Sequence, residues 1–191
     1  MISFQNISYS YQAGSPVFEN FSASIRTGTI TALTAPSGKG KTTLLHLTAG
    51  LLKPQSGHIS FSPSPSRISM VFQENRLIGT VSIMKNIKLV NKKLSESNIL
   101  SLLAQAGIEK YIHCIPSSLS GGEQRRVAIV RALAARHDIL LLDEPFTGLD
   151  KENKLRMCRM IKECSGHRTI ILVTHSNEDA LLLGCEEEVR L

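Results

Sequence analysis

Residues 138–142 are the strongest constraint on the fold, because Asp138 is followed by the uninterrupted aliphatic run Ile139, Leu140, Leu141 and Leu142. A strand of this composition is apolar on both faces and must be covered on both sides, as in a parallel sheet packed between helices. Around it, β-rich segments alternate with helical ones, which is typical of a layered α/β fold. We therefore predict an α/β fold with residues 138–142 as a buried parallel strand.

Hydrophobic periodicity and turn residues give the expected order of elements. The expected strands are residues 2–9, 17–25, 29–33, 59–61, 68–72, 139–142 and 169–173, the first two forming an antiparallel piece. The expected helices are residues 41–51, 83–90, 99–105, 151–164 and 177–183. From about residue 75 to 136 the pattern is helical and separates two halves of the α/β core. We predict one domain, residues 1–191, with a helical lobe at about 75–136 inserted in it.

The charge balance does not by itself indicate a partner. Lys and Arg number 22 against 16 Asp and Glu, a net charge of +6. Such an excess can indicate nucleic-acid binding. Here, however, the basic residues are spread along the chain, so we expect a generally basic surface, with attraction to a membrane edge as the alternative, and no direct contact with nucleic acid.

Three features of the sequence bear on the cellular compartment of the protein. No apolar run approaches the roughly 20 residues that span a bilayer, and the first residues lack the basic and apolar regions of a secretory signal. Cys114, Cys158, Cys164 and Cys185 contain no C-x-x-C pair. We expect reduced, partly buried thiols in a cytoplasmic protein.

A glycine-rich segment at residues 35–43 follows a predicted strand and opens a predicted helix, which is the context of a phosphate-binding loop. Its residues are Ala35, Pro36, Ser37, Gly38, Lys39, Gly40, Lys41, Thr42 and Thr43. Glycines let backbone N–H groups converge on a phosphate, and the helix N-terminus adds free donors. Lys41 can reach the β and γ phosphates of ATP, while the Thr42 hydroxyl can bind Mg²⁺.

The usual form of this loop begins with glycine, and Ala35 stands in that place. Alanine is tolerated if the backbone there is ordinary, since only a positive φ favours glycine. We predict that Ala35→Gly changes ATP affinity by no more than about tenfold, roughly 1.4 kcal/mol, in a binding titration.

Four polar residues are expected at the carboxyl ends of parallel strands, where sites in such folds gather. Asp143 and Glu144 follow the strand at 139–142, and strand alternation would point them to opposite sides. We assign Asp143 to the metal and Glu144 to the attacking water as general base. His175 should hydrogen-bond the γ-phosphate or that water, and Gln73, at the hinge into the helical lobe, should touch Mg²⁺ or the water.

A second phosphate-binding segment is predicted at Ser120, Gly121, Gly122, Glu123 and Gln124. It resembles a helix N-cap with a glutamate in the first turn, which leaves N–H groups and the Ser120 hydroxyl available. A nucleotide already held by Lys41 does not need this second contact from the same chain. We therefore expect it to act across a dimer interface.

Taken in order, these motifs resemble the ATP-binding cassette (ABC) family over essentially the whole chain. The motifs are Tyr11, residues 35–43, Gln73, residues 119–124, Asp143 with Glu144, residues 147–150 and His175. The resemblance implies a P-loop NTPase core with an antiparallel β subdomain and an inserted helical signature subdomain. It also implies that ATP and Mg²⁺ are cofactors, that Tyr11 (or, as the alternative, Tyr9) stacks on adenine, and that Asp150 lies at a dimer interface.

The resemblance further implies an ATPase subunit of an ABC transporter, catalytic through Glu144, His175, Lys41 and Gln73, with Thr42, Gln73 and Asp143 at the metal. ATP binding would close the dimer and hydrolysis would reopen it. Expected partners are a second ABC subunit, most simply a like chain, transmembrane permease subunits and a solute-binding protein. The chain would then lie peripherally on the inner face of the cell membrane.

Narrower features leave alternatives open. Residues 71–77 with Thr80 and Val81 look most like importer ATPases of the nitrate, sulfonate and taurine type. One alternative is a soluble ABC ATPase acting on nucleic acid or ribosomes, although the tandem cassettes or long insertions of such relatives do not fit in 191 residues. Another is a non-hydrolytic subunit, for which Ala35 is the support. So little chain follows His175 that we expect no room for the family's last strands and helices, or for an appended regulatory domain.

Overall fold

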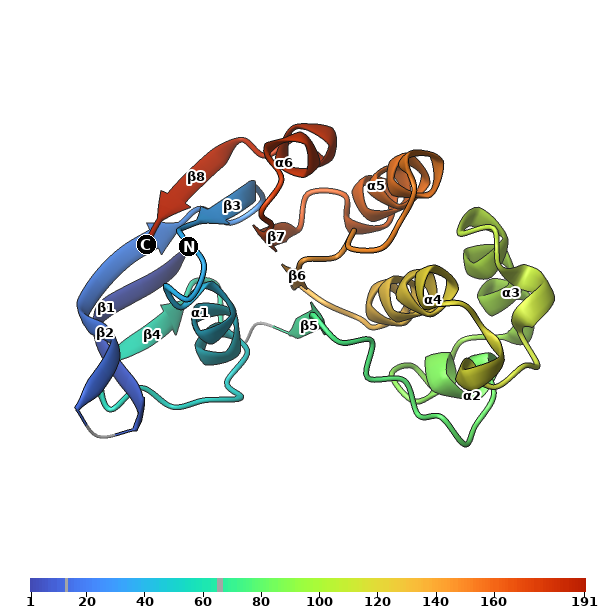
Figure 1. Cartoon of the computed structure of the whole chain (residues 1–191), viewed down its shortest axis with the longest axis horizontal. Coiled ribbons are helices and arrows are strands. Elements are labelled where there is room, and N and C mark those ends of the chain that lie inside the picture. Colours follow the sequence, from blue (N-terminus) through green and yellow to red (C-terminus); the bar gives the residue numbers. More distant parts are fainter. Residues whose placement is uncertain (13, 65–66) are drawn as a thin grey trace.

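A three-stranded antiparallel sheet forms one side of the molecule in the computed structural model, which describes residues 1–12, 14–64 and 67–191 (Figure 1). Its strands, in spatial order, are β2 (Ser15–Ile25), β1 (Ile2–Gln12) and β4 (Ser56–Phe61). The antiparallel pairing expected for the N-terminal strands is confirmed. Ile2 and Phe4 point inward and are buried, and Ile7 is buried too after a shift in register between Phe4 and Ile7, which fixes the face that covers the core.

A five-stranded parallel sheet forms the centre. In spatial order its strands are β5 (Ile68–Val71), β6 (Ile139–Asp143), β7 (Thr169–Val173), β3 (Ile30–Thr34) and β8 (Glu187–Arg190). Every residue of β6 and β7 is buried. Leu140 and Leu142 face one apolar cluster while Ile139 and Leu141 face the other, so the predicted two-sided burial of this strand is confirmed.

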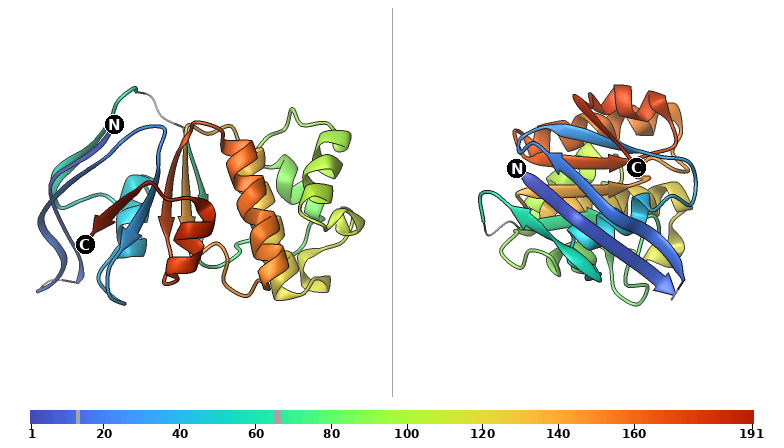
Figure 2. Two further views of the ribbon diagram at one scale, coloured as in Figure 1. Left: turned by 90° about the horizontal axis from the view of Figure 1, so that it is seen from above. Right: turned by 90° about the vertical axis from the view of Figure 1, so that its left-hand side faces the viewer.

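Helices cover the two faces of this sheet unequally. Helix α1 (Lys41–Thr48) lies with the antiparallel sheet on one side, whereas α4 (Gly121–Ala134) and α5 (Lys151–Ser165) lie on the other (Figure 2). Beyond α4 come the remaining elements of the helical segment: α2 (Ile83–Lys88), α3 (Glu96–Gln105) and the short 3-10 helices at Glu109–Tyr111 and Pro116–Ser118. Helix α6 (Asn177–Leu183) packs on α5. The predicted α/β class is therefore confirmed.

Several element ends differ from the expectations by up to three residues: α3 begins at Glu96 rather than 99, β4 begins at Ser56 rather than 59, and β1 ends at Gln12 rather than 9. Helix α1 ends at Thr48, not at residue 51, because Gly50 adopts a positive φ of 71° and the Leu51 N–H turns back to the His46 carbonyl. Against expectation, the chain after Gly184 forms a further strand, β8, which pairs in parallel with β3. Its residues alternate between half-buried and exposed, and charged side chains occupy this sheet edge.

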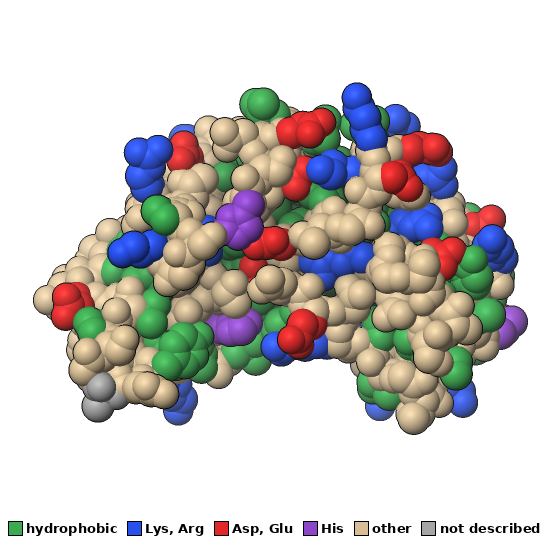
Figure 3. Space-filling view, viewed as in Figure 1, with side chains coloured by type: hydrophobic (Ala, Val, Ile, Leu, Met, Phe, Trp, Pro, Cys, Tyr) green, Lys and Arg blue, Asp and Glu red, His purple; other side chains and the backbone are tan. Residues whose placement is uncertain are grey.

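One face of the surface shows how the charges are distributed, and the burial of the thiols agrees with its prediction. On the face shown in Figure 3, Lys and Arg side chains are scattered among Asp and Glu rather than gathered in one basic patch. The four cysteines are free thiols, with Cys158 buried and the others half-buried. Burial raises the pKa of the Cys158 thiol to about 11, so it stays protonated at neutral pH. Within the described residues, no helix has the length and apolar content needed to cross a bilayer.

Candidate active site

The segment between β3 and α1 has the backbone geometry of a phosphate-binding loop. Gly38 and Gly40 have φ values of 78° and 90°, a region that side-chain-bearing residues avoid. A Cβ on Gly40 would also lie 2.7 Å from Val17 Cγ1 and 2.8 Å from an atom of the Phe18 ring. Helix α1 begins at Lys41 without a side-chain cap, so its first N–H groups point into the loop.

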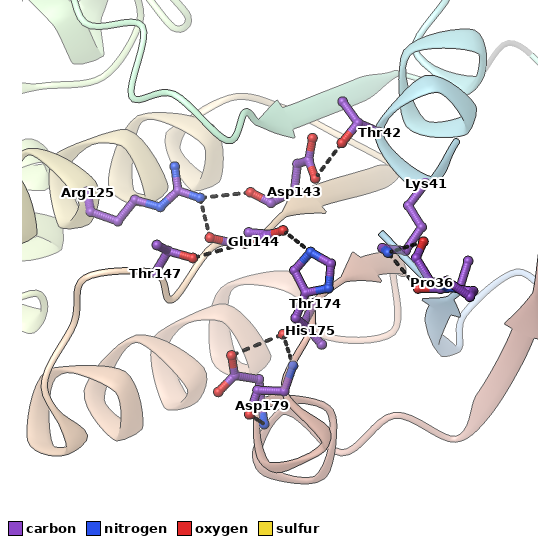
Figure 4. Close-up of polar contacts among 12 residues, drawn as sticks. Pro36, Lys41, Thr42, Arg125, Asp143, Glu144, Thr147, Thr174, His175 and Asp179 are labelled. Carbon is purple, nitrogen blue, oxygen red and sulfur yellow. Dashed lines mark hydrogen bonds and ion pairs between the residues drawn. The ribbon is translucent and has the colours of Figure 1, made fainter. Parts of the chain in front are cut away.

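Lys41 and Ala35 meet at the back of this loop. The buried Lys41 amine donates to the carbonyl oxygens of Ala35, at 2.7 Å, and Pro36, at 3.3 Å (Figure 4). Ala35 is not among the residues with a positive φ. The condition for tolerating alanine in place of glycine is therefore met.

One cavity of about 350 Å³ brings most of the predicted catalytic and nucleotide-binding residues together. It is lined by Tyr11, Val17, Ser37, Gly38, Gly40, Lys41, Thr42, Thr43, Gln73, Glu144, Val173 and His175. Ala35 and Pro36 instead line a neighbouring cavity, together with Arg190 of β8. Lys39 is exposed at the outer side of the loop.

The two candidate aromatics differ in exposure. Tyr9 is 9% exposed, whereas Tyr11 is 60% exposed and packs edge-on against Tyr9 with ring centroids 5.1 Å apart. The Tyr11 hydroxyl shares a hydrogen bond of 3.1 Å with the Thr43 hydroxyl, which fixes the ring beside the loop. Of the two rings, Tyr11 therefore offers a free surface for stacking on a base.

The predicted metal ligands fit Mg²⁺. Asp143 is buried at the end of β6, and its Oδ1 accepts a hydrogen bond of 3.2 Å from the Thr42 hydroxyl. Its Oδ2 is also buried and has no hydrogen-bond partner among the residues described. Burial raises the pKa of Asp143, since the ionised form has lost its water. A carboxylate oxygen in need of a partner, beside a hydroxyl and the cavity-lining Gln73, is a donor set suited to Mg²⁺.

The Glu144 side chain has partners other than those of Asp143, as predicted, but strand alternation is not the cause. Its φ is 47°, a left-handed conformation, so the strand ends at Asp143 and strand alternation does not decide where Glu144 points. Its N–H donates to the Val173 carbonyl at 2.9 Å. Glu144 Oε1 lies 2.7 Å from His175 Nε2, and Oε2 accepts a 3.3 Å hydrogen bond from the Thr147 hydroxyl. His175 thus orients the predicted base directly.

The second phosphate-binding segment lies apart from the first cavity. Ser120 and Glu123 form the predicted capping box: the Glu123 N–H donates to Ser120 Oγ, and the Ser120 N–H donates to Glu123 Oε2 at 2.8 Å. A separate cavity of about 310 Å³ is lined by Ser120, Gly122, Glu123, Arg126, Gly148, Leu149, Asp150 and Asn153. The signature residues and the segment at Asp150 therefore face one space, and the phosphate loop faces another.

Gly122, Gln124 and Asp150 of this region have different surroundings. Gly122 packs closely, because a Cβ there would lie 3.2 Å from the Gly148 carbonyl oxygen. Gln124 does not line the cavity, since its amide turns back to donate to the Leu119 carbonyl at 3.0 Å. Asp150 caps α5, and hydrogen bonds from Asn153 lower the pKa of its carboxyl.

Sequence reasoning missed Arg125. It lies in the signature helix α4 beside other charged residues, where an arginine usually faces solvent. In the fold it is buried and donates to the carbonyl oxygens of Asp143 and Glu144 (Figure 4). It also donates to the Gln73 carbonyl. In the sequence, the only sign of this burial is that Arg125 lies on the helix face that carries the core residues.

Comparison with known proteins decides the family. The ABC transporter family model matches residues 18–147, which is more than half of the chain. The chain belongs to the ABC transporter family. This ABC ATPase is 35% identical over 211 residues to the thiamine import ATP-binding protein ThiQ of Aliivibrio fischeri, covering 99% of the chain and 89% of that relative. It is 38% identical over 185 residues to the thiamine import ATP-binding protein ThiQ of Escherichia coli, covering 88% and 80%.

Solved structures agree with this family assignment. The dimeric post-hydrolysis structure of the ATP-binding cassette MJ0796 with ADP and Pi superposes with a TM-score of 0.88 at 27% identity, covering 100% of this chain and 94% of that one. A bacterial Atm1-family ABC exporter with ATP bound gives a TM-score of 0.89 at 24% identity, covering 100% and 37%, and shows the fold alone. The predicted family, fold, ATPase activity and use of ATP with Mg²⁺ are confirmed. The narrower resemblance of residues 71–77 to nitrate-type importers stays a prediction.

Proposed function

We propose that this chain is the energising subunit of an ABC importer and works as a dimer of two like chains beneath separate permease subunits. The observation that carries the dimer is the division of the site into two cavities within one chain. The phosphate loop, Glu144 and His175 line one, while Ser120 and Asp150 line the other. Two chains arranged head to tail would bring each signature segment onto the partner's nucleotide and so complete two ATP sites.

Each predicted residue then has a defined task. Tyr11 would stack on the base, the loop N–H groups and Lys41 would hold the phosphates, and Thr42, Asp143 and Gln73 would hold Mg²⁺. Held there, Mg²⁺ would neutralise negative charge on the phosphates. Glu144 would accept the proton of the attacking water, held in place by its 2.7 Å contact with His175 and by Thr147.

The helical segment is proposed as the surface that meets the permease. In this view residues 1–191 are one ABC domain, and residues 75–136 form a lobe inserted in it. Gln73 lies just before that lobe in the chain and also lines the proposed ATP cavity. A change at the nucleotide would therefore reach the lobe through Gln73. The chain would lie on the cytoplasmic face of the membrane.

The relatives suggest the transported solute. Both of the curated relatives named above are thiamine import proteins and are matched over most of their length. We therefore propose import of thiamine or a closely similar small organic solute, delivered by a solute-binding protein.

Co-purification tests the transporter assignment. Tagged Glu144→Gln protein, which should trap ATP, is recovered with ATP and Mg²⁺ from gently solubilised native membranes, with Lys41→Ala protein as the matched control. We expect a polytopic membrane protein in the captured complex, identified by mass spectrometry. Recovery of soluble or nucleic-acid-bound partners alone would contradict the transporter assignment and leave the ATPase assignment intact.

The solute is tested on that captured permease, reconstituted with wild-type ATPase chains and its solute-binding protein. Thiamine is expected to raise the rate of ATP hydrolysis. If another solute stimulates hydrolysis and thiamine does not, thiamine is excluded as the transported solute, while the assignment as an importer stands.

A further inference from the structure

Arg125 is a buried cation whose hydrogen-bond partners, apart from the Asn75 side chain, are backbone carbonyl oxygens. It lies in the second turn of α4 and is 3% exposed. Its Nη2 donates to the carbonyl oxygens of Asp143 and Glu144, at 2.8 and 2.6 Å. Its Nη1 donates to those of Phe72 and Gln73, at 2.5 and 3.1 Å. Further bonds go from Nε to the Pro145 carbonyl at 2.9 Å and from Nη1 to Asn75 Oδ1 at 3.3 Å.

This set of bonds requires an arginine. Burying a charge is costly unless it is fully hydrogen-bonded. The planar guanidinium carries five donors in a fixed fork, so it can satisfy several carbonyls on two sides at once, whereas lysine is a point charge. Burial lowers the pKa of Arg125, and the nearby Asp143 and Glu144 oppose that shift. Arginine keeps its charge in proteins, and here its N–H groups donate to five main-chain carbonyl oxygens and to the Asn75 side chain.

The two segments that Arg125 joins both carry predicted catalytic residues. One leaves β5 and contains Gln73; the other is the turn after β6 and contains Glu144. Glu144 holds a left-handed φ of 47°, a conformation that is unfavourable outside glycine and persists when surrounding contacts impose it. Its N–H is bound by the Val173 carbonyl, and its own carbonyl is bound by Arg125.

We propose that Arg125 is a positioning residue for ATP hydrolysis, which fixes the main chain at Glu144 and Gln73 to α4, the helix that Ser120 caps. The proposal rests on the roles assigned above to Glu144 and Gln73. It ties the direction of the Glu144 carboxylate to the placement of α4 in the same chain. The helix that would meet the partner's nucleotide through Ser120 therefore also holds the base for its own chain's nucleotide.

Arg131 is a matched control on the same helix. Its guanidinium is half-buried and donates to the carbonyl oxygens of Asn75, at 3.1 Å, and Arg76, at 2.8 Å. It therefore anchors the backbone just beyond Gln73, and its hydrogen bonds go to neither Gln73 nor Glu144. Replacing it removes backbone anchoring of the same chemical kind.

The test compares Arg125→Gln, Arg125→Lys and Arg131→Gln in the full chain. We measure kcat and KM for ATP hydrolysis, the Kd of a fluorescent ATP analogue at concentrations where the chain is monomeric, and Tm. Arg125→Gln is expected to lower kcat between about 10- and 100-fold, the scale of a displaced catalytic group, with KM and Kd within about twofold. Arg125→Lys should lie between it and wild type. Arg131→Gln should lower Tm but keep kcat near wild type.

A double variant separates positioning from a general loss of structure. If Arg125 acts mainly through Glu144, then Arg125→Gln lowers kcat far less in the Glu144→Gln background than it does in the wild-type chain. If the two losses of kcat multiply in the double variant, or if the kcat of Arg125→Gln is no lower than that of Arg131→Gln, the proposal is overturned. If Arg125→Gln fails to fold, the intermediate kcat and unchanged KM of Arg125→Lys carry the same test, and wild-type kcat in that variant would overturn it. An inactive wild-type chain, or an active Glu144→Gln variant, would instead remove the proposed function, and this proposal with it.

Discussion

Glu144 shows at the scale of one residue how the base is placed. It leaves the strand in a left-handed conformation, and its carboxylate meets His175 on one oxygen and Thr147 on the other. Asp143, its neighbour, remains in the strand and meets Thr42. Adjacent carboxylates can therefore take different tasks because the backbone turns between them.

The first prediction concerns the base. Glu144→Gln should retain ATP binding and lower the rate of hydrolysis by about 10²–10⁴-fold, because the amide cannot accept the proton of the attacking water. Phosphate release and a binding titration are the measurements. Glu152→Gln, which alters an exposed carboxylate paired with Arg156, is the control and should hydrolyse normally. Hydrolysis by Glu144→Gln at the wild-type rate would show that another group is the base.

The second prediction concerns pH and Asp143. Burial raises its pKa, so its favourable contribution to folding is present below its unfolded pKa, about 3.9, and is lost as pH rises through the folded value. At pH 7, without Mg²⁺, the ionised carboxylate therefore opposes folding. Asp143→Asn should raise Tm in EDTA at pH 7 by about 2–4 °C, corresponding to roughly 1 kcal/mol in a chain of this size, and by less as pH falls toward 4.

Asp138→Asn provides a comparison of opposite sign. Its hydrogen bond to Arg67 lowers the pKa of Asp138, so that carboxylate stabilises the fold above its unfolded pKa and the contribution is lost as pH falls. Asp138→Asn should therefore lower Tm at pH 7. A fall in Tm for Asp143→Asn in EDTA would contradict the account of a carboxylate that lacks its partner.

At the scale of the element, α3 and α4 both begin with a serine cap, but of these two only α4 lies in a predicted ATP site. Ser120 caps α4 and Ser95 caps α3, each in an extended conformation with its hydroxyl accepting a backbone N–H. Loss of such a cap costs about 1 kcal/mol. Ser120→Ala and Ser95→Ala should therefore lower the free energy of unfolding by similar amounts.

The third prediction follows from this pair. Ser120→Ala should also lower ATP hydrolysis strongly while leaving ATP binding to the monomer unchanged, because its hydroxyl acts on the partner's nucleotide. Ser95→Ala should keep normal hydrolysis. Chemical denaturation, ATP titration and phosphate release measure the three quantities. Weaker ATP binding by isolated Ser120→Ala monomers would place the hydroxyl at its own chain's nucleotide and contradict the dimer.

At the scale of the whole molecule, one chain carries the phosphate loop in one cavity and Ser120 in another. Each proposed ATP site therefore needs two chains. The fourth prediction uses two variants, Lys41→Ala and Ser120→Ala, each expected to be inactive alone. In a mixed dimer one site has both an intact Lys41 and an intact Ser120. Mixing equal amounts should restore up to about a quarter of the wild-type rate, since half of the dimers are mixed and each has one complete site. No recovery, with mixed dimers shown by mass spectrometry, would contradict the head-to-tail arrangement.

The sequence by itself determined the local features. Residues 177–183 were predicted as a helix with the bounds that α6 has, and the Ser120–Glu123 capping box and the buried strand at 139–142 were also predicted. Each of these signals is carried by residues a few positions apart, through helical period, capping or uninterrupted apolar composition. The order of motifs along the chain likewise fixed the family before any contact was known.

Tertiary structure decided the features that depend on distant contacts. β8 forms by pairing with β3, more than 150 residues earlier in the chain, and the Glu144 backbone is held by Val173 and Arg125. Arg125 is buried only because segments from β5 and β6 converge on α4. Whether residues share a cavity, or a charge is desolvated, depends on which surfaces meet in the fold. Short-range sequence patterns do not contain that information.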